Sequence, residues 1–168
     1  NMANIDAPFV NQPWDPGNKY TVCKDWGTTG FVYDKTKIKR QLTSWADFLD
    51  VIQHEASGQV SVLDDPGELT GVYFWANGID WNTEDPAQLD ACEDVVVNQL
   101  APHIKAFNSY PGIELAQRNY VLSQVFNGDA RQGLLSVDHP ERYTWGVGAP
   151  TSELWMDNWC ILKGAKNV

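Results

Sequence analysis

Short runs of β-branched and aromatic residues alternate along this chain with stretches in which apolar residues recur every three or four positions. Leu89, Cys92, Val96 and Leu100 show the second pattern, and their spacing predicts one face of a helix. Residues 1–19 are rich in Asn, Pro and Gly, which predicts coil. The strand-like runs are residues 20–23, 30–33, 59–63, 120–126, 143–147 and 154–162.

Capping signals mark where helices begin. The run Ser-Trp-Ala-Asp at residues 44–47 has the form of a capping box, which predicts a helix over about residues 45–52. Asp85-Pro86 opens the long apolar stretch in a similar way. Shorter helices are expected at residues 113–117 and after Asn127. This order of elements is typical of an α/β fold with a mixed sheet flanked by helices, and the length predicts a single domain.

Another helix begins with a cluster of acids. Asp65 stands at its N-cap, Pro66 at N1 and Glu68 at N3, and Gly78 follows the expected end near residue 76. Both acids have a structural explanation, because N-cap and N3 carboxylates accept hydrogen bonds from free backbone N–H groups. A helix N-terminus also favours the ionised acid, so we expect both to be charged at neutral pH. Charged acids here could receive a cation but would be poor general acids.

Composition narrows the function. The net charge is −10, which argues against nucleic acid or an anionic membrane surface as a partner. The chain contains eight Trp residues, and aromatic faces attract organic cations and stack on sugars. No apolar run approaches the roughly 18–20 residues of a membrane span. An acidic, Trp-rich protein therefore favours a site for sugars or organic cations.

Enzyme motifs are absent from the sequence. It has no nucleophile elbow, Walker loop, dinucleotide fingerprint or zinc-protease motif, and its three His residues are scattered. We therefore expect no catalytic residues, no cofactor and no metal. Cys92 lies on the helical apolar face and should be buried, whereas pairing of Cys23 with Cys160 stays open.

A second candidate group lies near the C-terminus. In a strand, Trp155 and Asp157 would point to the same side, and a ring beside a carboxylate is a suitable site for an ammonium group. The alternative is a half-buried strand Trp beside a solvated Asp. Phe126 at a strand end and Ser109 after a helix end are weaker candidates, since ligands often bind at strand ends of α/β sheets.

Taken together, these segments resemble the periplasmic spermidine/putrescine-binding proteins of ABC importers, within the type II solute-binding superfamily. The similarity is collinear and extends over nearly the whole chain. The residues that carry it are 13–18 (PWDPGN), Tyr20, 26–30 (WGTTG), 43–47 (TSWAD), 63–68 (LDDPGE), 82–86 (NTEDP), 106–109 (AFNS), 155–158 (WMDN) and 163–167 (KGAKN).

The resemblance implies one lobe of a two-lobed periplasmic-binding-protein fold, with residues 1–168 forming the second lobe and residues 1–24 and 160–168 forming interlobe crossing segments. The first lobe would be missing from this chain. By position, Phe126 stands where the family usually has Trp, which leaves open which polyamine is preferred. The implied ligand-binding residues are Asp65 and Glu68 for amines, Trp155 against the methylene chain, Asp157 for an amine, Ser109 as a polar contact and Phe126 as an aromatic wall.

The implied function is binding of putrescine, spermidine or another small cationic solute and its delivery to an ABC permease, without chemistry. The protein would be periplasmic or extracytoplasmic, either free or lipid-anchored. Alternatives are the same fold with a sugar, an amino-acid derivative or a metal chelate, a carbohydrate-active enzyme fragment that uses Asp65 and Glu68, and a structural α/β domain. Exposed crossing strands would also allow the isolated lobe to self-associate.

Overall fold

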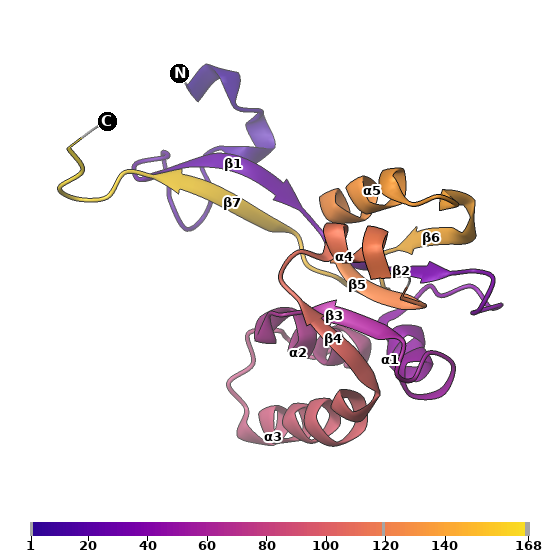
Figure 1. The fold of residues 1–168 in the computed structure, drawn as a ribbon. Coiled ribbons are helices and arrows are strands. Elements are labelled where there is room, and N and C mark those ends of the chain that lie inside the picture. The colour runs from indigo at the N-terminus through magenta and orange to yellow at the C-terminus, as the bar shows by residue number, and fades with distance from the viewer. Residues whose placement is uncertain (1, 119, 167–168) are drawn as a thin grey trace. The chain divides into compact units, whose positions relative to one another are not determined.

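The computed structural model describes residues 2–118 and 120–166, and the chain separates into two compact units (Figure 1). Residues 28–153 form the sheet unit, and residues 1–27 with 154–168 form the ribbon unit. Chain length alone predicts a single domain, but it cannot show that two distant segments pair with each other. The assignment of residues 1–24 and 160–168 as crossing segments stays a prediction.

The sheet unit contains a five-stranded mixed sheet in the order β4-β3-β5-β2-β6. β3 runs parallel to both β4 and β5, whereas β2 runs antiparallel to β5 and β6. The strands are β2 (Thr29–Asp34), β3 (Val60–Leu63), β4 (Ile104–Asn108), β5 (Leu122–Phe126) and β6 (Tyr143–Gly146).

Helices cover both faces of this sheet, so the predicted α/β class with a mixed sheet flanked by helices is confirmed. One hydrophobic cluster joins the sheet to α1, α2 and the π-helical turn that extends α3, and a smaller cluster joins it to α4 and α5. The helices are α1 (Trp45–His54), α2 (Pro66–Asn77), α3 (Pro86–Asp94), its π-helical extension (Val95–Leu100), α4 (Pro111–Arg118) and α5 (Asn127–Ser136). Short 3-10 turns are Met2–Asn4, Ala7–Phe9, Ala101–His103 and Pro140–Arg142.

The larger cluster is built around Trp45, which is fully buried. Its ring lies 5.5 Å from Phe31 of β2 and 5.3 Å from Trp75 of α2, measured between centroids, and its Nε1 donates to the backbone oxygen of Thr151. Aromatic rings gain more than their buried area alone when they pack edge-on or tilted. Trp45 and Trp75 therefore belong to the core, and only part of the Trp content is available to a ligand site.

Local signals place most helix boundaries correctly. The capping box at Ser44 and Asp47 is complete, and Gly78 ends α2 with a φ of 66°. Cys92 is buried on α3, as its place on the apolar face predicts. The strand β4 was not predicted, because its residues alternate only between half-buried and exposed before Asn108.

The ribbon unit pairs β1 (Thr21–Gly27) antiparallel with β7 (Trp155–Cys160). Gly27 lies opposite Trp155, and Thr21 lies opposite Cys160. Cys23 instead faces Asn158, and both Cys23 and Cys160 are free thiols. The two cysteines lie on neighbouring strands out of register, and the pairing left open by the sequence is not made.

Substituting Gly30→Ala should destabilise the sheet, because a Cβ there would lie against the backbone oxygen of Gly146 and 2.7 Å from Cζ2 of Trp145. Overpacking of this kind costs roughly 1–3 kcal/mol, and we expect at least about 2 kcal/mol in urea unfolding. Gly128→Ala is the matched control, because nothing lies within 4 Å of its added Cβ. Equal midpoints for the two variants would contradict the close approach of β2 to β6.

Candidate functional site

The parallel strands gather the predicted residues of the sheet unit at one edge. Because β3, β4 and β5 are parallel, their carboxyl ends lie at the same edge of the sheet. Asp65 follows β3, Ser109 follows β4, and Phe126 is the last residue of β5. Crevices outside the carboxyl ends of strands are the usual ligand sites of open α/β sheets. The fold therefore supplies a reason for these three residues to act together.

Asp65 is the N-cap of α2. Its Oδ1 accepts hydrogen bonds from the backbone N–H groups of Gly67 at 2.8 Å and Glu68 at 3.2 Å. The side chain is exposed to solvent, and both capping bonds end on the same oxygen. The capping role is therefore confirmed, and Oδ2 lies outside the cap, where a ligand amine could reach it.

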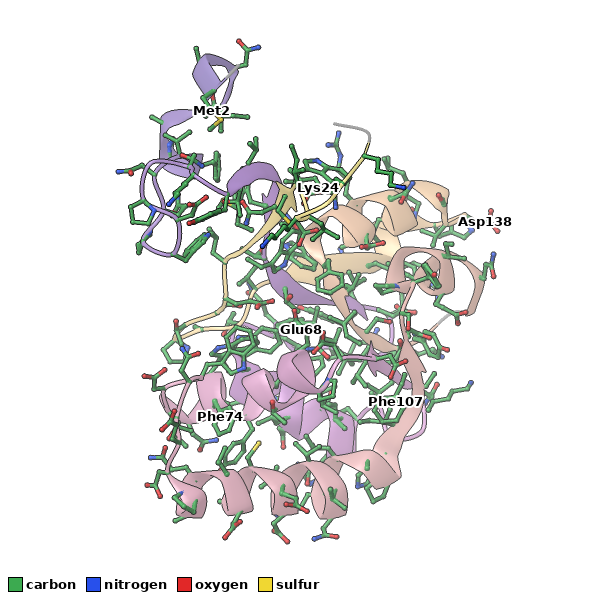
Figure 2. The ribbon with its side chains drawn as sticks, turned by 90° about the vertical axis from the view of Figure 1, so that its left-hand side faces the viewer. Met2, Lys24, Glu68, Phe74, Phe107 and Asp138 are labelled. Atoms are coloured by element: carbon green, nitrogen blue, oxygen red, sulfur yellow. The ribbon has the colours of Figure 1, made fainter. Side chains whose placement is uncertain are left out.

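Glu68 does not act as a cap, although its position at N3 predicts this. The residue is 7% exposed on the first turn of α2 inside the sheet unit (Figure 2), and Oε2 is buried without a hydrogen-bond partner among the described residues. Its backbone oxygen accepts a bond from Nε2 of Gln124 at 2.9 Å, and Oε1 of Gln124 accepts from the N–H of Leu63. Gln124 thus fixes this turn of α2 against β3 and β5.

Glu153 and Thr29 complete the surroundings of Glu68. The Thr29 hydroxyl donates to Oε1 of Glu153, and the Glu153 carboxyl lies within hydrogen-bonding reach of Glu68. Thr29 is fully buried, and Glu153 is 9% exposed. Neither residue was a sequence candidate, because no motif connects positions so far from Glu68 along the chain. Only the fold reveals this carboxyl pair.

Burial raises the pKa of Glu68 to about 9, and the adjacent Glu153 carboxyl adds to the increase. A hydrogen bond with Thr29 opposes the shift, and the charge of Asp65 contributes a smaller increase. The expectation that the helix N-terminus keeps Glu68 ionised is therefore wrong. Desolvation and a like charge outweigh the helix dipole, so Glu68 holds a proton at neutral pH.

Two further candidates lie at the same edge. Ser109 is exposed, and its hydroxyl donates to Oδ2 of Asp64 at 3.3 Å. Phe126 is half-buried, pairs with Thr29 across the β5–β2 ladder and occupies the N-cap position of α5. Asp64, which the sequence did not single out, adds a third carboxylate beside Asp65.

Trp81 is an aromatic residue of this edge that the sequence did not single out. Its Nε1 donates to the backbone oxygen of Gly67 at 3.2 Å, and its ring meets Trp75 edge-on at 5.2 Å. A Cβ on Gly67 would lie 3.2 Å from Oδ1 of Asp65 and 3.7 Å from Cζ2 of Trp81. The ring and the carboxylate thus flank Gly67, which places an aromatic surface near the cap of α2.

The remaining candidates, Trp155 and Asp157, belong to the ribbon unit. They lie two residues apart on β7, as predicted, which places both side chains on one face of the strand. Asp157 is exposed and pairs with Nζ of Lys24 on β1 at 3.0 Å, while Lys24 also lies 3.5 Å from Asp25. The hydrogen bond from Lys24 to Asp157 raises the pKa of the lysine. Asp157 is thus already paired with one ammonium group, that of Lys24.

Among residues 2–118 and 120–166, no group of three or more His, Cys, Asp or Glu side chains is arranged to hold a metal ion. Within the same residues, every helix is too short or too polar to cross a membrane.

Substituting Glu68→Gln should change how stability depends on pH. The folded chain keeps the Glu68 proton up to about pH 9, whereas the unfolded chain releases it near the ordinary value of 4.5. The wild type therefore loses up to about 1.4 kcal/mol of stability per pH unit across this window, and the variant lacks this loss. Urea unfolding of both chains at pH 5.5, 7 and 8.5 measures the difference. Parallel stability curves would contradict the buried proton.

Comparisons with known proteins give the relatives of this chain. No family model matches it. The spermidine/putrescine-binding periplasmic protein of Escherichia coli is 29% identical over 172 residues, covering 99% of this chain and 47% of that protein. The substrate-binding protein PotD of a spermidine/putrescine ABC transporter from Streptococcus pneumoniae has a TM-score of 0.76 at 31% identity, covering 94% of this chain and 47% of that protein. The TpPotD lipoprotein of Treponema pallidum has a TM-score of 0.80 at 20% identity, covering 97% of this chain and 50% of that protein. This likeness shows a shared fold.

The chain spans about half the length of the curated relatives that it matches. The similarity nevertheless extends along nearly all of this chain, and sequence and structure agree on the same group of proteins. The chain is therefore homologous, over nearly all of its residues, to one half of the spermidine/putrescine-binding periplasmic proteins.

Proposed function

We propose that this chain is the ligand-binding half of a polyamine-binding protein that delivers its solute to an ABC importer. The observation that carries the proposal is the similarity along 99% of the chain to a protein named for spermidine and putrescine binding. The acidic edge of the sheet unit supports it, because Asp64 and Asp65 are exposed there, and Asp65 flanks Gly67 together with the ring of Trp81.

A polyamine suits this chemistry. Its ammonium groups are fixed by charge-assisted hydrogen bonds to carboxylates, and its methylene chain packs against apolar walls. Asp65 and Glu68 would take one amine, and Ser109 and Phe126 would line the path next to them. Within the ribbon unit, Trp155 and Asp157 would offer a ring and a carboxylate to an amine. The net charge of −10 would draw a polycation toward the site.

Binding would use a hinge. In such a mechanism a first lobe, absent from this chain, closes over the solute, and the closed form docks on the permease. The relatives named above include a periplasmic protein and an ABC substrate-binding protein. We therefore place this protein in the periplasm or another extracytoplasmic space.

A carbohydrate-active enzyme is the alternative that the raised pKa of Glu68 favours, since a glycosidase acid needs such a shift. The geometry argues against it. Glycosidase carboxyls stand roughly 5–9.5 Å apart so that a sugar or a water molecule fits between them. Of the two acids in this alternative, Asp65 caps α2, and Glu68 instead lies within hydrogen-bonding reach of the Glu153 carboxyl, which suits a shared proton. The relatives are solute-binding proteins, and we propose binding without chemistry.

Titration with putrescine, followed by NMR, tests the proposal. We expect saturable shifts of the Asp65 amide and the Trp81 indole that weaken with salt, because ionic contacts are screened. Asp65→Asn should weaken binding about tenfold, the effect of losing roughly 1.4 kcal/mol from one charged hydrogen bond. Asp138→Asn, which removes the same charge at an exposed position, is the control.

Maltose serves as a neutral ligand in the same titration. Shifts with maltose alone would replace the polyamine with a sugar. If a protein of the relatives' full length also failed to bind putrescine, the proposed function would be wrong.

Substituting Lys24→Met should tighten putrescine binding, because the Lys24 ammonium occupies Asp157 and a ligand amine has to displace it. Exposed ion pairs contribute roughly 0.2–1 kcal/mol, so we expect an affinity about two- to fivefold higher. Lys163→Met removes the same charge from an exposed position of the ribbon unit and should have a smaller effect. An unchanged or lower affinity in the Lys24 variant would exclude Asp157 as an amine ligand.

A further inference from the structure

The carboxyl pair at Glu68 and Glu153 contains a residue that the proposed polyamine site does not yet use. Glu153 is the last residue of the sheet unit, and Thr29 is the second residue of that unit. The hydrogen bond between them therefore joins the two ends of the unit, at the point where Glu68 projects from α2. A buried acid in this position needs a chemical explanation, because an unpaired carboxylate is costly to desolvate.

Hydrogen-bond counting provides that explanation. The single Thr29 hydroxyl proton is donated to Oε1 of Glu153, and because Thr29 also hydrogen-bonds Glu68, one proton has to serve two carboxyls. Oε2 of Glu68 is buried and receives no donor from the described residues, although the Glu153 carboxyl is within hydrogen-bonding reach. Two ionised carboxylates would leave this oxygen unsatisfied beside a like charge. One proton held between them satisfies the oxygen and removes the repulsion.

We propose that Glu153 is a ligand-binding residue of the polyamine site, because its carboxyl shares one proton with Glu68 in the free protein and the pair releases that proton when an ammonium group binds. This inference rests on the proposed function. The charge balance is simple: a pair with one negative charge and one proton becomes a pair with two negative charges, the proton leaves to solvent, and the ammonium replaces it. No bond other than O–H breaks.

The surroundings of the pair support release of the proton on binding. The charged groups that act on Glu68 are Glu153 and Asp65, and both are acidic. Burial holds the proton in the free protein and repulsion from these two acids adds to it, whereas an incoming cation favours the ionised pair. Glu68 and Glu153 are both largely buried residues, 7% and 9% exposed, and Oε2 of Glu68 is itself buried. The pair therefore favours a cation that can satisfy two carboxylates over a neutral solute of the same size.

The coupling has a defined sign with pH. Below the pH at which the free pair loses its proton, each ligand that binds must displace that proton, so affinity rises with pH by up to tenfold per unit. The ligand amines keep their own protons over this range, as lysine does. A site with permanently ionised acids would show no such slope between pH 6 and 8.5.

The first experiment measures the protonation of the Glu68–Glu153 pair in the absence of ligand. A ¹³C-carboxyl NMR titration of the free chain should place the Glu68 midpoint well above its ordinary value. In Glu153→Gln the midpoint should fall below pH 7, since the variant amide donates to Glu68 and removes its charged neighbour. Asp138→Asn, an exposed acid far from Glu68 in sequence, should leave the midpoint unchanged. An ordinary midpoint in the wild type would overturn the shared proton.

The second experiment measures the protons released on binding. Calorimetric titration with putrescine at pH 7, in two buffers of different ionisation enthalpy, should give close to one proton per ligand for the wild type and Asp138→Asn. Glu153→Gln should still bind but release much less than one proton. Equal release in Glu153→Gln and the wild type would overturn the role of Glu153 alone. Absence of putrescine binding to the wild type and to a full-length protein, with the raised Glu68 midpoint intact, would overturn the proposed function and leave the pair as a structural element.

Discussion

β3 has a parallel strand on each side, so its carboxyl end must lie beside those of β4 and β5. Parallel strands need covered faces, and α1, α2 and α3 with its π-helical extension supply one cover while α4 and α5 supply the other. The chain therefore passes out of a strand at this same edge three times, at the ends of β3, β4 and β5. Asp65, Ser109 and Phe126 reach that edge through this topology and not through proximity in sequence.

The two acids at the start of α2 have different roles. Asp65 alone satisfies the N–H groups of Gly67 and Glu68, which frees Glu68 from capping. Glu68 can then turn inward toward Thr29 and Glu153, where burial and not the helix dipole sets its protonation. One exposed acid that caps the helix and one buried acid with a raised pKa thus stand three residues apart. Their different environments give neighbouring carboxyls of the same helix turn different chemistry.

Sequence patterns correctly predicted the structural features that depend on local interactions. The caps at Ser44 and Asp65, the stop at Gly78 and the mixed α/β order all follow from neighbouring residues. β4 was missed because an edge strand with one exposed side has a weak alternation. The state of Glu68 was predicted wrongly because its decisive partner, Glu153, is distant in sequence, and no alternation or capping rule reports a contact of that kind. Trp45 and Trp75 show the same limit, since composition counts a ring without showing which core it fills.

The ribbon unit has a consequence for the order in which the chain folds. Lys24 and Asp157 meet although they are 133 positions apart. Closing a flexible loop of that length costs about 4 kcal/mol of chain entropy, and a two-stranded ribbon by itself is marginally stable. The bond between Thr29 and Glu153 removes most of this cost once the sheet unit has folded, because Thr29 closely follows the end of β1 and Glu153 closely precedes the start of β7. The sheet unit must therefore form first, and the ribbon is the last part to assemble and the first to open.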